Sequence, residues 1–172
     1  PGQYLDWVPR TRPELYYQQF CGTAPTHHIF GLREALDILV HEEGIENAWK
    51  RHETIAASVW AAVDAWGEGG ELRHNIADRD KRSCAVSTLC TGKDGARTIR
   101  AWCEANAGVT LGIGLGFGAP ESEEWNRHFR IGHMGHLNTV MIMGVLGSID
   151  ASMKALKIPH GEGALSAASS VL

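Results

Sequence analysis

The residues best suited to chemistry lie in a short run near the C-terminal end of the chain, from Phe129 to His136. This run places Arg130 within an apolar, strand-like segment, followed by two glycines and two histidines. An arginine is costly to bury without an anionic partner, and no Asp or Glu occurs in the ten residues after it. An external carboxylate or phosphate is one candidate partner, because a guanidinium matches a carboxylate with two parallel hydrogen bonds. A distant acidic side chain of the same fold is the alternative.

A second candidate is the strand-like segment that alternates apolar residues with Gly112, Gly114 and Gly116. The glycines leave one face of the strand without side chains, so that another backbone or a ligand can approach closely. A dinucleotide fingerprint would require a helix directly afterwards, whereas Pro120 and a polar loop follow here. We therefore reject nucleotide binding, and tight packing under a helix stays open beside ligand approach.

Two further clusters have simpler explanations. His133 and His136 are three residues apart, a spacing that binds zinc on a helix, but they fall at a strand end and in a turn. We therefore predict no metal site, and expect helix capping or a hydrogen bond to a neighbouring loop. Thr23 precedes a helix, where a hydroxyl and exposed backbone N–H groups suit a phosphate. From these residues alone, an ordinary N-terminal cap is the favoured role of Thr23.

The composition limits the class of protein. The 172 residues fit one domain, or one domain and a piece of another, and the net charge of -4 without a basic run argues against a nucleic-acid partner. No apolar stretch approaches the length of a membrane span, and the N-terminus shows no secretory signal. The four cysteines lack CxxC spacing, which predicts buried free thiols in a reducing compartment. We therefore expect a cytoplasmic protein.

The elements that must position these residues fall into two predicted domains. In residues 1–66, an aromatic-rich loop up to about Pro25 is expected to lie across another surface. Apolar spacings of three and four from Ile29 to Leu39 predict a helix, and a longer helix is expected from Ile45 to Trp66. Because two helices follow one another before any strand, we interpret residues 1–66 as the end of a large domain with connector helices.

Residues 67–172 are predicted to form a small α/β sandwich, with a sheet that carries helices on one face. Strands are expected over residues 83–91, 109–115 and 129–133, and helices over residues 95–107 and 138–156. Asp94 is expected to cap the first of these helices. Residues 163–172 are expected to form a docked or frayed tail.

Three segments taken together resemble the class V, fold type I pyridoxal-phosphate-dependent aminotransferases. They are Phe20–Pro25, Gly31–Leu36 and Arg130–Gly135, and the connector near Gly44–Trp49 and the tail near Gly161–Gly163 are also similar. The nearest members are the alanine/serine–glyoxylate aminotransferases, with the pyridoxamine–pyruvate aminotransferases close by. The resemblance covers essentially the whole chain and implies the C-terminal part of such a transferase.

The resemblance implies a role for two residues of this chain. Arg130 would bind the substrate carboxylate, and Thr23 would contact the phosphate of pyridoxal 5'-phosphate across a homodimer whose active sites lie at the interface. Phe20 stands where many relatives have tyrosine, so the resemblance implies one phosphate contact that Phe20 cannot make and that Tyr16 or Tyr17 could supply instead. The strand and loop around Gly114–Gly116 would lie near the substrate entrance.

The implied activity moves an amino group from a small amino acid, alanine or serine, to glyoxylate or pyruvate, with pyridoxamine–pyruvate aminotransferase activity as an alternative. The family's Schiff-base lysine lies in the missing N-terminal portion of the enzyme, so no catalytic residue is assigned and the chain should be inactive alone. None of the lysines present matches the family's motif; they are Lys50, Lys81, Lys93, Lys154 and Lys157.

Rival interpretations come from other classes of protein. One is a non-catalytic module that binds an amino acid and regulates another protein. A second is a lyase or desulfurase on the same fold, against which Cys90 and Cys103 argue, because a desulfurase needs a mobile cysteine and both fall in regular elements. A third is a metal-dependent hydrolase that uses the histidines.

Overall fold

The computed structural model describes residues 5–172 and divides them into two compact units, residues 5–48 and 49–172. The long helix α3 (Ile45–Gly67) begins in the last residues of the first unit and continues through the second. The Ile45–Trp66 helix expected from the sequence is therefore confirmed. The domain boundary predicted between residues 66 and 67 stays a prediction.

The first unit is built from short helical elements that bury little. The helix α1 (Val8–Thr11) and the 3-10 helix η1 (Tyr16–Phe20) occupy the segment expected to be a loop. The helix α2 (Thr26–Leu36) continues as a π-helix, η2 (Asp37–Glu43), and Gly44 ends it with a φ of 83°. The predicted helix is confirmed, but none of these four elements contains a buried residue.

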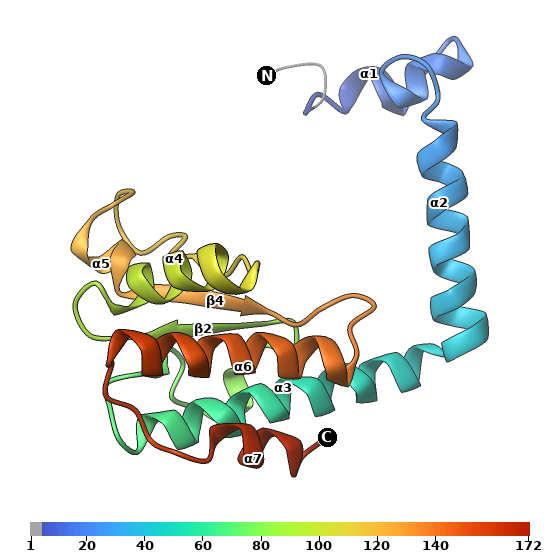
Figure 1. Cartoon of the computed structure of the whole chain (residues 1–172). Coiled ribbons are helices and arrows are strands. Elements are labelled where there is room, and N and C mark those ends of the chain that lie inside the picture. The colour runs from blue at the N-terminus through green and yellow to red at the C-terminus, as the bar shows by residue number, and fades with distance from the viewer. Residues whose placement is uncertain (1–4) are drawn as a thin grey trace. The chain divides into compact units, whose positions relative to one another are not determined.

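The second unit contains a four-stranded sheet formed by β1 (Arg73–His74), β2 (Val86–Cys90), β3 (Gly112–Ile113) and β4 (His128–Gly132). The order is β1-β2-β4-β3 and every neighbouring pair is antiparallel, with β2 and β4 side by side at its centre (Figure 1). The register places Thr88 opposite Arg130. The strands expected near residues 83–91 and 129–133 are thus confirmed.

The third expected strand is much shorter than its alternating pattern indicates. Only Gly112 and Ile113 form a strand, paired with β4, whereas a strand was expected over residues 109–115. Leu111 is instead buried in the core, and Gly114 lies so close to the carbonyl of Trp125 that an added Cβ would stand 2.5 Å from its oxygen. The alternation therefore records burial of a loop against its neighbours, and only partly a ladder of hydrogen bonds.

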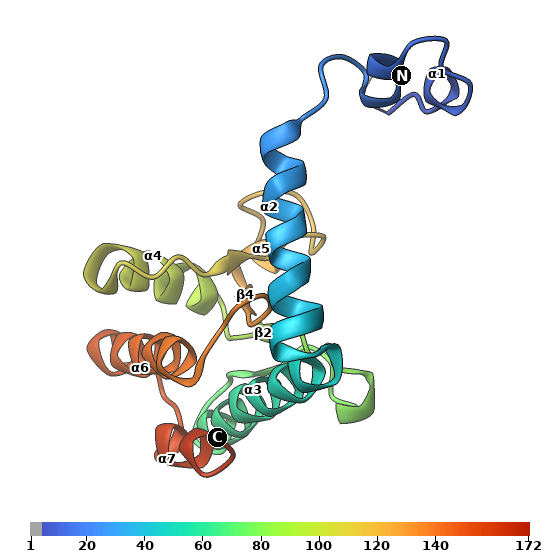
Figure 2. The ribbon, with the colours of Figure 1, turned by 90° about the vertical axis from the view of Figure 1, so that its right-hand side faces the viewer.

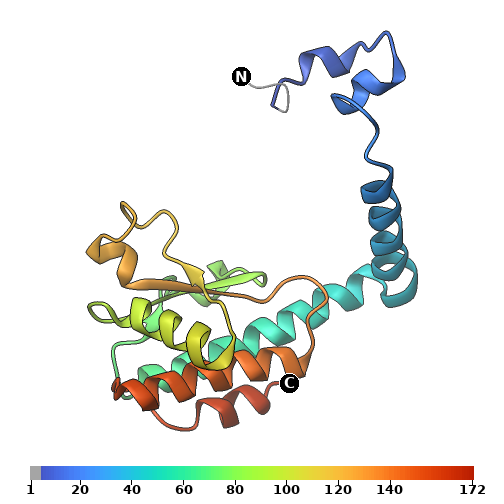
Figure 3. The ribbon, with the colours of Figure 1, turned by 45° about the horizontal axis from the view of Figure 1, so that its top comes forward.

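The helices of the second unit lie mainly against one face of the sheet. Figure 2 shows α4 (Gly95–Ala107) and α6 (Thr139–Leu156) on the same side of β2 and β4. The last helix, α7 (Ala164–Ser169), packs beside α6 (Figure 3), so the C-terminal tail is docked. The short elements η3 (Arg79–Lys81) and α5 (Glu123–Asn126) lie in the connections before β2 and before β4.

A single core joins the helices to the inner face of the sheet. Phe129 and Ile131 alternate along β4 with residues that face the other way, as a strand with one buried face requires. Most residues expected on the inner faces of α3, α4 and α6 are buried, whereas Trp102 is partly buried and Leu156, expected on the α6 stripe, is 38% exposed. The buried ones are Ile55, Val59, Val63, Trp66, Ile99, Cys103, Ile142, Leu146, Ile149 and Met153.

Two expectations about helices need correction. Asp94 stands at the N-cap of α4 but has a φ of 56° and forms no capping hydrogen bond with its side chain; it lies 4.0 Å from Arg97. The helix α6 is long and apolar enough to cross a membrane, so the statement that no apolar stretch approaches that length is wrong. A core helix passes the same test, and α6 turns its Ile142 to Met153 stripe into the core.

Candidate functional site

Arg130 projects from the face of the sheet opposite the helical core. Its neighbours along β4, Phe129 and Ile131, are buried on the core side, while the side chain of Arg130 is only half-buried. The expectation of an arginine in a dry strand is therefore wrong in this respect, because a β-strand alternates its faces and Arg130 occupies the open one.

The guanidinium of Arg130 is held by a backbone carbonyl. Its Nε donates to the carbonyl oxygen of Ile113 at 2.9 Å. Among residues 5–172 no carboxylate lies within ion-pair distance of Arg130, so the alternative of an internal acidic partner finds no support. The outer nitrogens of the guanidinium are left to face the space beside the sheet.

Gly112 makes room for this side chain. An added Cβ at Gly112 would lie 3.0 Å from the Cβ of Arg130 and 3.2 Å from its Nε. A larger residue would therefore require Arg130 to shift by a few tenths of an ångström. The bare strand face detected in the sequence thus serves the arginine at this one position, while Gly114 serves close packing of the loop.

A cavity of about 400 Å³ opens beside Arg130 on the outer face of the sheet. Its lining carries three permanently cationic side chains, several hydroxyls and no carboxylate. The lining residues are His74, Ile76, Lys81, Arg82, Ser83, Val86, Ser87, Thr88, Leu115 and Arg130. Sequence reasoning missed Lys81, Arg82 and His74, since they come from irregular, polar segments whose pattern does not reveal that they converge.

A buried hydrogen-bond chain supports the floor of this cavity. The Nε1–H of Trp60 donates to Ser87 Oγ at 3.0 Å, and Ser87 Oγ lies 3.0 Å from His133 Nε2. His133 Nδ1 lies 3.0 Å from the carbonyl oxygen of Cys84, which can only accept, so Nδ1 carries the proton and the Ser87 hydroxyl donates to Nε2. Burial lowers the pKa of His133, which keeps this tautomer neutral. The expected hydrogen-bonding role of His133 is confirmed.

His74 lies at the opposite end of the same cavity. Its Nε2 is 3.2 Å from Asp64 Oδ1 and 3.4 Å from the carbonyl oxygen of Trp60. Burial and the nearby charge of Arg82 lower the pKa of His74, and Asp64 acts against them.

The loop between β3 and α5 forms one wall of the cavity. Leu115 lines it, and the following Gly116 and Gly118 adopt φ angles of 88° and 92° that favour glycine. Phe117 stacks on His128 with ring centroids 3.9 Å apart, which anchors the loop to β4. Leu115 and Arg130 therefore line the same cavity, while the expectation that the segment around Gly114–Gly116 lies near a substrate entrance stays a prediction.

Thr23 lies in the first unit and is exposed. Its hydroxyl forms no hydrogen bond with any of the residues the structure describes. The N-cap of α2 is Pro25, without a capping side chain, so the explanation of Thr23 as an ordinary cap is wrong. Thr23 follows a turn in which Cys21 has a φ of 59° and Gly22 a φ of 147°.

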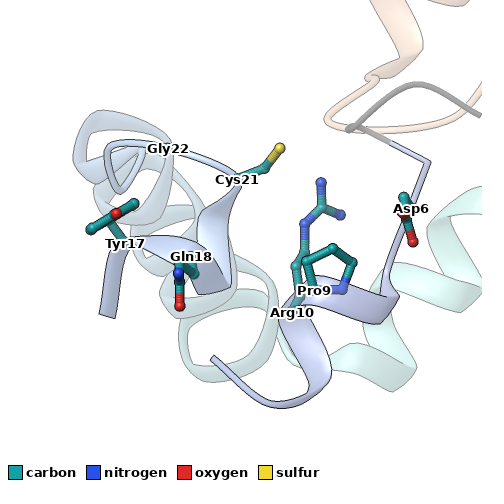
Figure 4. A pocket seen from close by; sticks show the side chains of 7 residues that line it. All are labelled: Asp6, Pro9, Arg10, Tyr17, Gln18, Cys21 and Gly22. Carbon is teal, nitrogen blue, oxygen red and sulfur yellow. The ribbon is translucent and has the colours of Figure 1, made fainter. Parts of the chain in front are cut away.

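The first unit has a cavity of its own next to this turn, with a volume of about 270 Å³. Its lining residues are Asp6, Pro9, Arg10, Tyr17, Gln18, Cys21 and Gly22. Figure 4 shows the thiol of Cys21 and the guanidinium of Arg10 reaching into the space between η1 and α1. Phe20, which stands where many relatives have tyrosine, makes an edge-on contact with Tyr16, and the two ring centroids are 5.4 Å apart.

The other groups considered from the sequence are engaged in structure. Within residues 5–172 no three His, Cys, Asp or Glu residues gather in a way that could hold a metal ion, and both ring nitrogens of His133 contact protein atoms. Cys90 and Cys103 are buried in β2 and α4, which makes neither a mobile cysteine. Lys154 pairs with Asp150 at 2.7 Å on α6.

Comparisons with known proteins relate the chain to one group of enzymes. No protein-family model matches it. It is 31% identical over 172 residues to a serine–glyoxylate aminotransferase of Methylorubrum extorquens, and the alignment spans 96% of this chain and 39% of that protein. It is 30% identical over 141 residues to an L-aspartate–glyoxylate aminotransferase of Paracoccus denitrificans, spanning 80% of this chain and 32% of that protein.

The fold is also similar to that of an aminotransferase of known structure. The crystal structure of a pyridoxamine–pyruvate aminotransferase from Mesorhizobium loti superposes with a TM-score of 0.70 at 27% identity, over 88% of this chain and 37% of the other. The chain thus spans well under half the length of the proteins it matches, and the matched part is their C-terminal portion.

Proposed function

Because this chain is homologous to the C-terminal part of the class V aminotransferases, which depend on pyridoxal phosphate, we propose that it serves the same reaction. The complete protein would move an amino group from serine or alanine to glyoxylate or pyruvate, as the names of its relatives indicate. Arg130 would bind the carboxylate of both the amino acid and the 2-oxo acid. The active unit would be a homodimer in the cytoplasm.

The observation that carries this proposal is the state of Arg130. Its guanidinium is oriented by the carbonyl of Ile113, is accommodated by Gly112, and faces a cavity whose lining contains no carboxylate. A fixed guanidinium with unused N–H donors suits a planar anion that accepts two parallel hydrogen bonds. A substrate carboxylate has this geometry.

Part of the cofactor's setting fits the first unit. Thr23 presents a hydroxyl that has no partner among the described residues, two positions before Pro25, the N-cap of the 11-residue helix α2. The first N–H groups of a helix and a nearby hydroxyl together suit a phosphate. Thr23 would therefore hold the phosphate of pyridoxal phosphate. None of the chain's lysines matches the family's lysine motif, so we propose that these residues alone do not catalyse transamination.

The chain's own residues contribute binding and orientation. Pyridoxal phosphate, when bound, supplies the electron-accepting ring of the reaction. Arg130 fixes the substrate carboxylate and thereby the direction of the bond to the α-hydrogen. Leu115 supplies an apolar part of the cavity lining, and the Ser87–His133 hydrogen bond connects the segments on either side of β2 and β4 behind Arg130.

The test is the substitution Arg130→Gln in the complete enzyme. Loss of a charge-assisted pair of hydrogen bonds should lower kcat/KM for both the amino acid and the 2-oxo acid by roughly 10- to 100-fold. Steady-state kinetics with each substrate measures the loss. Arg97→Gln is the matched control, because Arg97 is exposed on α4 and lies away from the cavity lining. Unchanged kinetics in Arg130→Gln would refute the role of Arg130.

A non-catalytic amino-acid-binding module is the remaining alternative. It predicts that the chain, supplied with the rest of the enzyme, does not give a preparation with the visible absorbance of pyridoxal phosphate. Absorbance spectroscopy of the complete protein separates the two functions.

A further inference from the structure

We propose that the cavity beside Arg130 also recognises a second anionic group, so that dianionic amino and 2-oxo acids are accepted besides the monocarboxylates named above and bind more tightly than they do. This inference rests on the proposed function, in which Arg130 binds the first carboxylate. It concerns what the rest of the same cavity selects.

The first argument is the charge of the lining. Lys81, Arg82 and Arg130 line one cavity of about 400 Å³, and no Asp or Glu lines it. The chain as a whole carries a net charge of -4, so this face reverses the sign of the protein's overall charge. A concave surface with one sign of charge concentrates ligands of the opposite sign. A substrate with a single carboxylate would use only one of the three cations.

The second argument is that Arg82 is held in place without a carboxylate. Its Nε donates to the carbonyl oxygen of Ile76 at 2.9 Å and its Nη2 to that of Ala77 at 3.0 Å. Its guanidinium carbon also lies 5.7 Å from the centre of the Trp60 ring. These contacts fix the position of the charge but leave it uncompensated, since among the described residues no acidic side chain forms an ion pair with Arg82.

The third argument is the position of Lys81 at the rim. Its Nζ lies 3.0 Å from Asp78 Oδ2, and both side chains are exposed. An exposed ion pair contributes little, so the flexible ammonium can exchange Asp78 for a ligand anion at small cost. Asp78 itself does not line the cavity.

Hydroxyl groups complete the polar surface. Thr88 lies opposite Arg130 in the sheet and its side chain has no hydrogen-bond partner among residues 5–172. The Ser87 hydroxyl, by contrast, is committed to His133. The geometry therefore offers Arg130 for one anionic group and Lys81, with the nearby charge of Arg82 and the Thr88 hydroxyl, for the second.

The experiment titrates the complete enzyme at low salt with propionate, with succinate and with 2-phosphoglycolate, and measures each affinity by isothermal titration calorimetry. Succinate and 2-phosphoglycolate distinguish a second carboxylate from a phosphate. We expect at least one of them to bind about tenfold more tightly than propionate, since one further charge-assisted contact is gained. Higher salt should reduce this difference.

Three variants locate the effect. Lys81→Gln should abolish the preference for the dianion and leave propionate binding unchanged. Asp78→Asn should strengthen dianion binding by a few-fold, because it removes the competing carboxylate while the amide oxygen can still accept from the N–H of Asp80. Lys93→Gln is the matched control, as Lys93 is an exposed lysine outside this cavity.

The outcomes separate the two proposals. Propionate binding that is lost in Arg130→Gln, together with equal affinity for all three acids, would overturn the dianion preference alone. A preference that persists in Lys81→Gln would also overturn it. Binding that does not depend on Arg130, or no binding of any of the acids, would overturn the proposed role of Arg130 and this inference with it.

Discussion

The two units of this chain use similar amphipathic helices in opposite circumstances. In the second unit, the apolar stripes of α3, α4 and α6 are buried against one another and against β2 and β4. In the first unit, the stripe of α2 has the same spacing, yet Ile29 is 43% exposed and Leu32 59% exposed. The difference shows that the apolar pattern of a helix predicts which face tends to be buried, but does not show whether the same chain supplies the surface that buries it.

This contrast also separates the two predicted site residues. Arg130 is oriented by contacts from within its own unit, namely the carbonyl of Ile113 and the space over Gly112. Thr23 is exposed and receives no such support from the residues described. In the proposed site, the arginine side would therefore be preformed in this chain, whereas the phosphate side would depend on other parts of the enzyme.

The largest difference is expected in hydrogen exchange. Amides in the middle of α3 and β4 should exchange at least about a thousandfold more slowly than those of α2. Opening α3 or β4 requires unfolding the core, whereas α2 contains no buried residue and can open without exposing any core. Mass spectrometry of the isolated 172-residue chain measures both rates. Equal protection of α2 and α3 would show that the first unit is covered by contacts not present in this structure, such as those of a second copy.

The next effect is on stability, tested with matched leucines. Leu146→Ala removes a fully buried side chain of α6 and should lower the free energy of unfolding of the second unit by about 2–5 kcal/mol. Leu32→Ala, on the exposed stripe of α2, should change it by no more than about 0.5 kcal/mol. Urea denaturation followed by tryptophan fluorescence compares the two. A large loss in Leu32→Ala would mean that the two units share a core.

The smallest effect is a pH dependence confined to the second unit. Burial lowers the pKa of His133 from its usual 6.5, so the unfolded chain binds a proton that the folded chain refuses. The contribution of His133 to stability is therefore fully present above about pH 6.5 and declines as the pH falls below it. The total loss is on the order of 1 kcal/mol for each pH unit by which folding lowers the pKa of His133. Urea denaturation at a series of pH values from about 5 to 8, the range in which histidine titrates, measures this decline in stability.

Two substitutions assign this dependence. His133→Gln should flatten the decline, leaving the part contributed by His74, whose pKa burial and Arg82 also lower. His136→Gln, at an exposed position of the same loop, should leave the profile unchanged. An unaltered decline in His133→Gln would show that His133 is not its source.

The sequence predicted the elements whose pattern is fixed by burial within the chain. The stripes of α3 and α6 and the strand around Arg130 were placed within a few residues, because each apolar side chain meets the core formed by the others. The resemblance to class V aminotransferases, carried by segments such as Arg130–Gly135, is confirmed by the homologues.

What could not be predicted depends on contacts between distant segments. The strand β1 (Arg73–His74) has two polar residues and exists only because β2 offers it a partner. Lys81 and Arg82 lie in an irregular connection beside the cavity, so no periodic pattern in the sequence predicts that they line it. Whether Arg130 is buried or half-open depends on which face of β4 the helices cover, and the pairing register decides that.

The unequal strand lengths also limit how molecules of this protein can associate. The outermost strands of the sheet, β1 and β3, have two residues each, while the inner pair has five each. An edge this short offers almost no unpaired backbone for a foreign strand to extend, and this is a recognised protection against aggregation. Self-association should therefore proceed through side-chain surfaces, such as the exposed apolar stripe of α2, and not through growth of a continuous intermolecular ribbon.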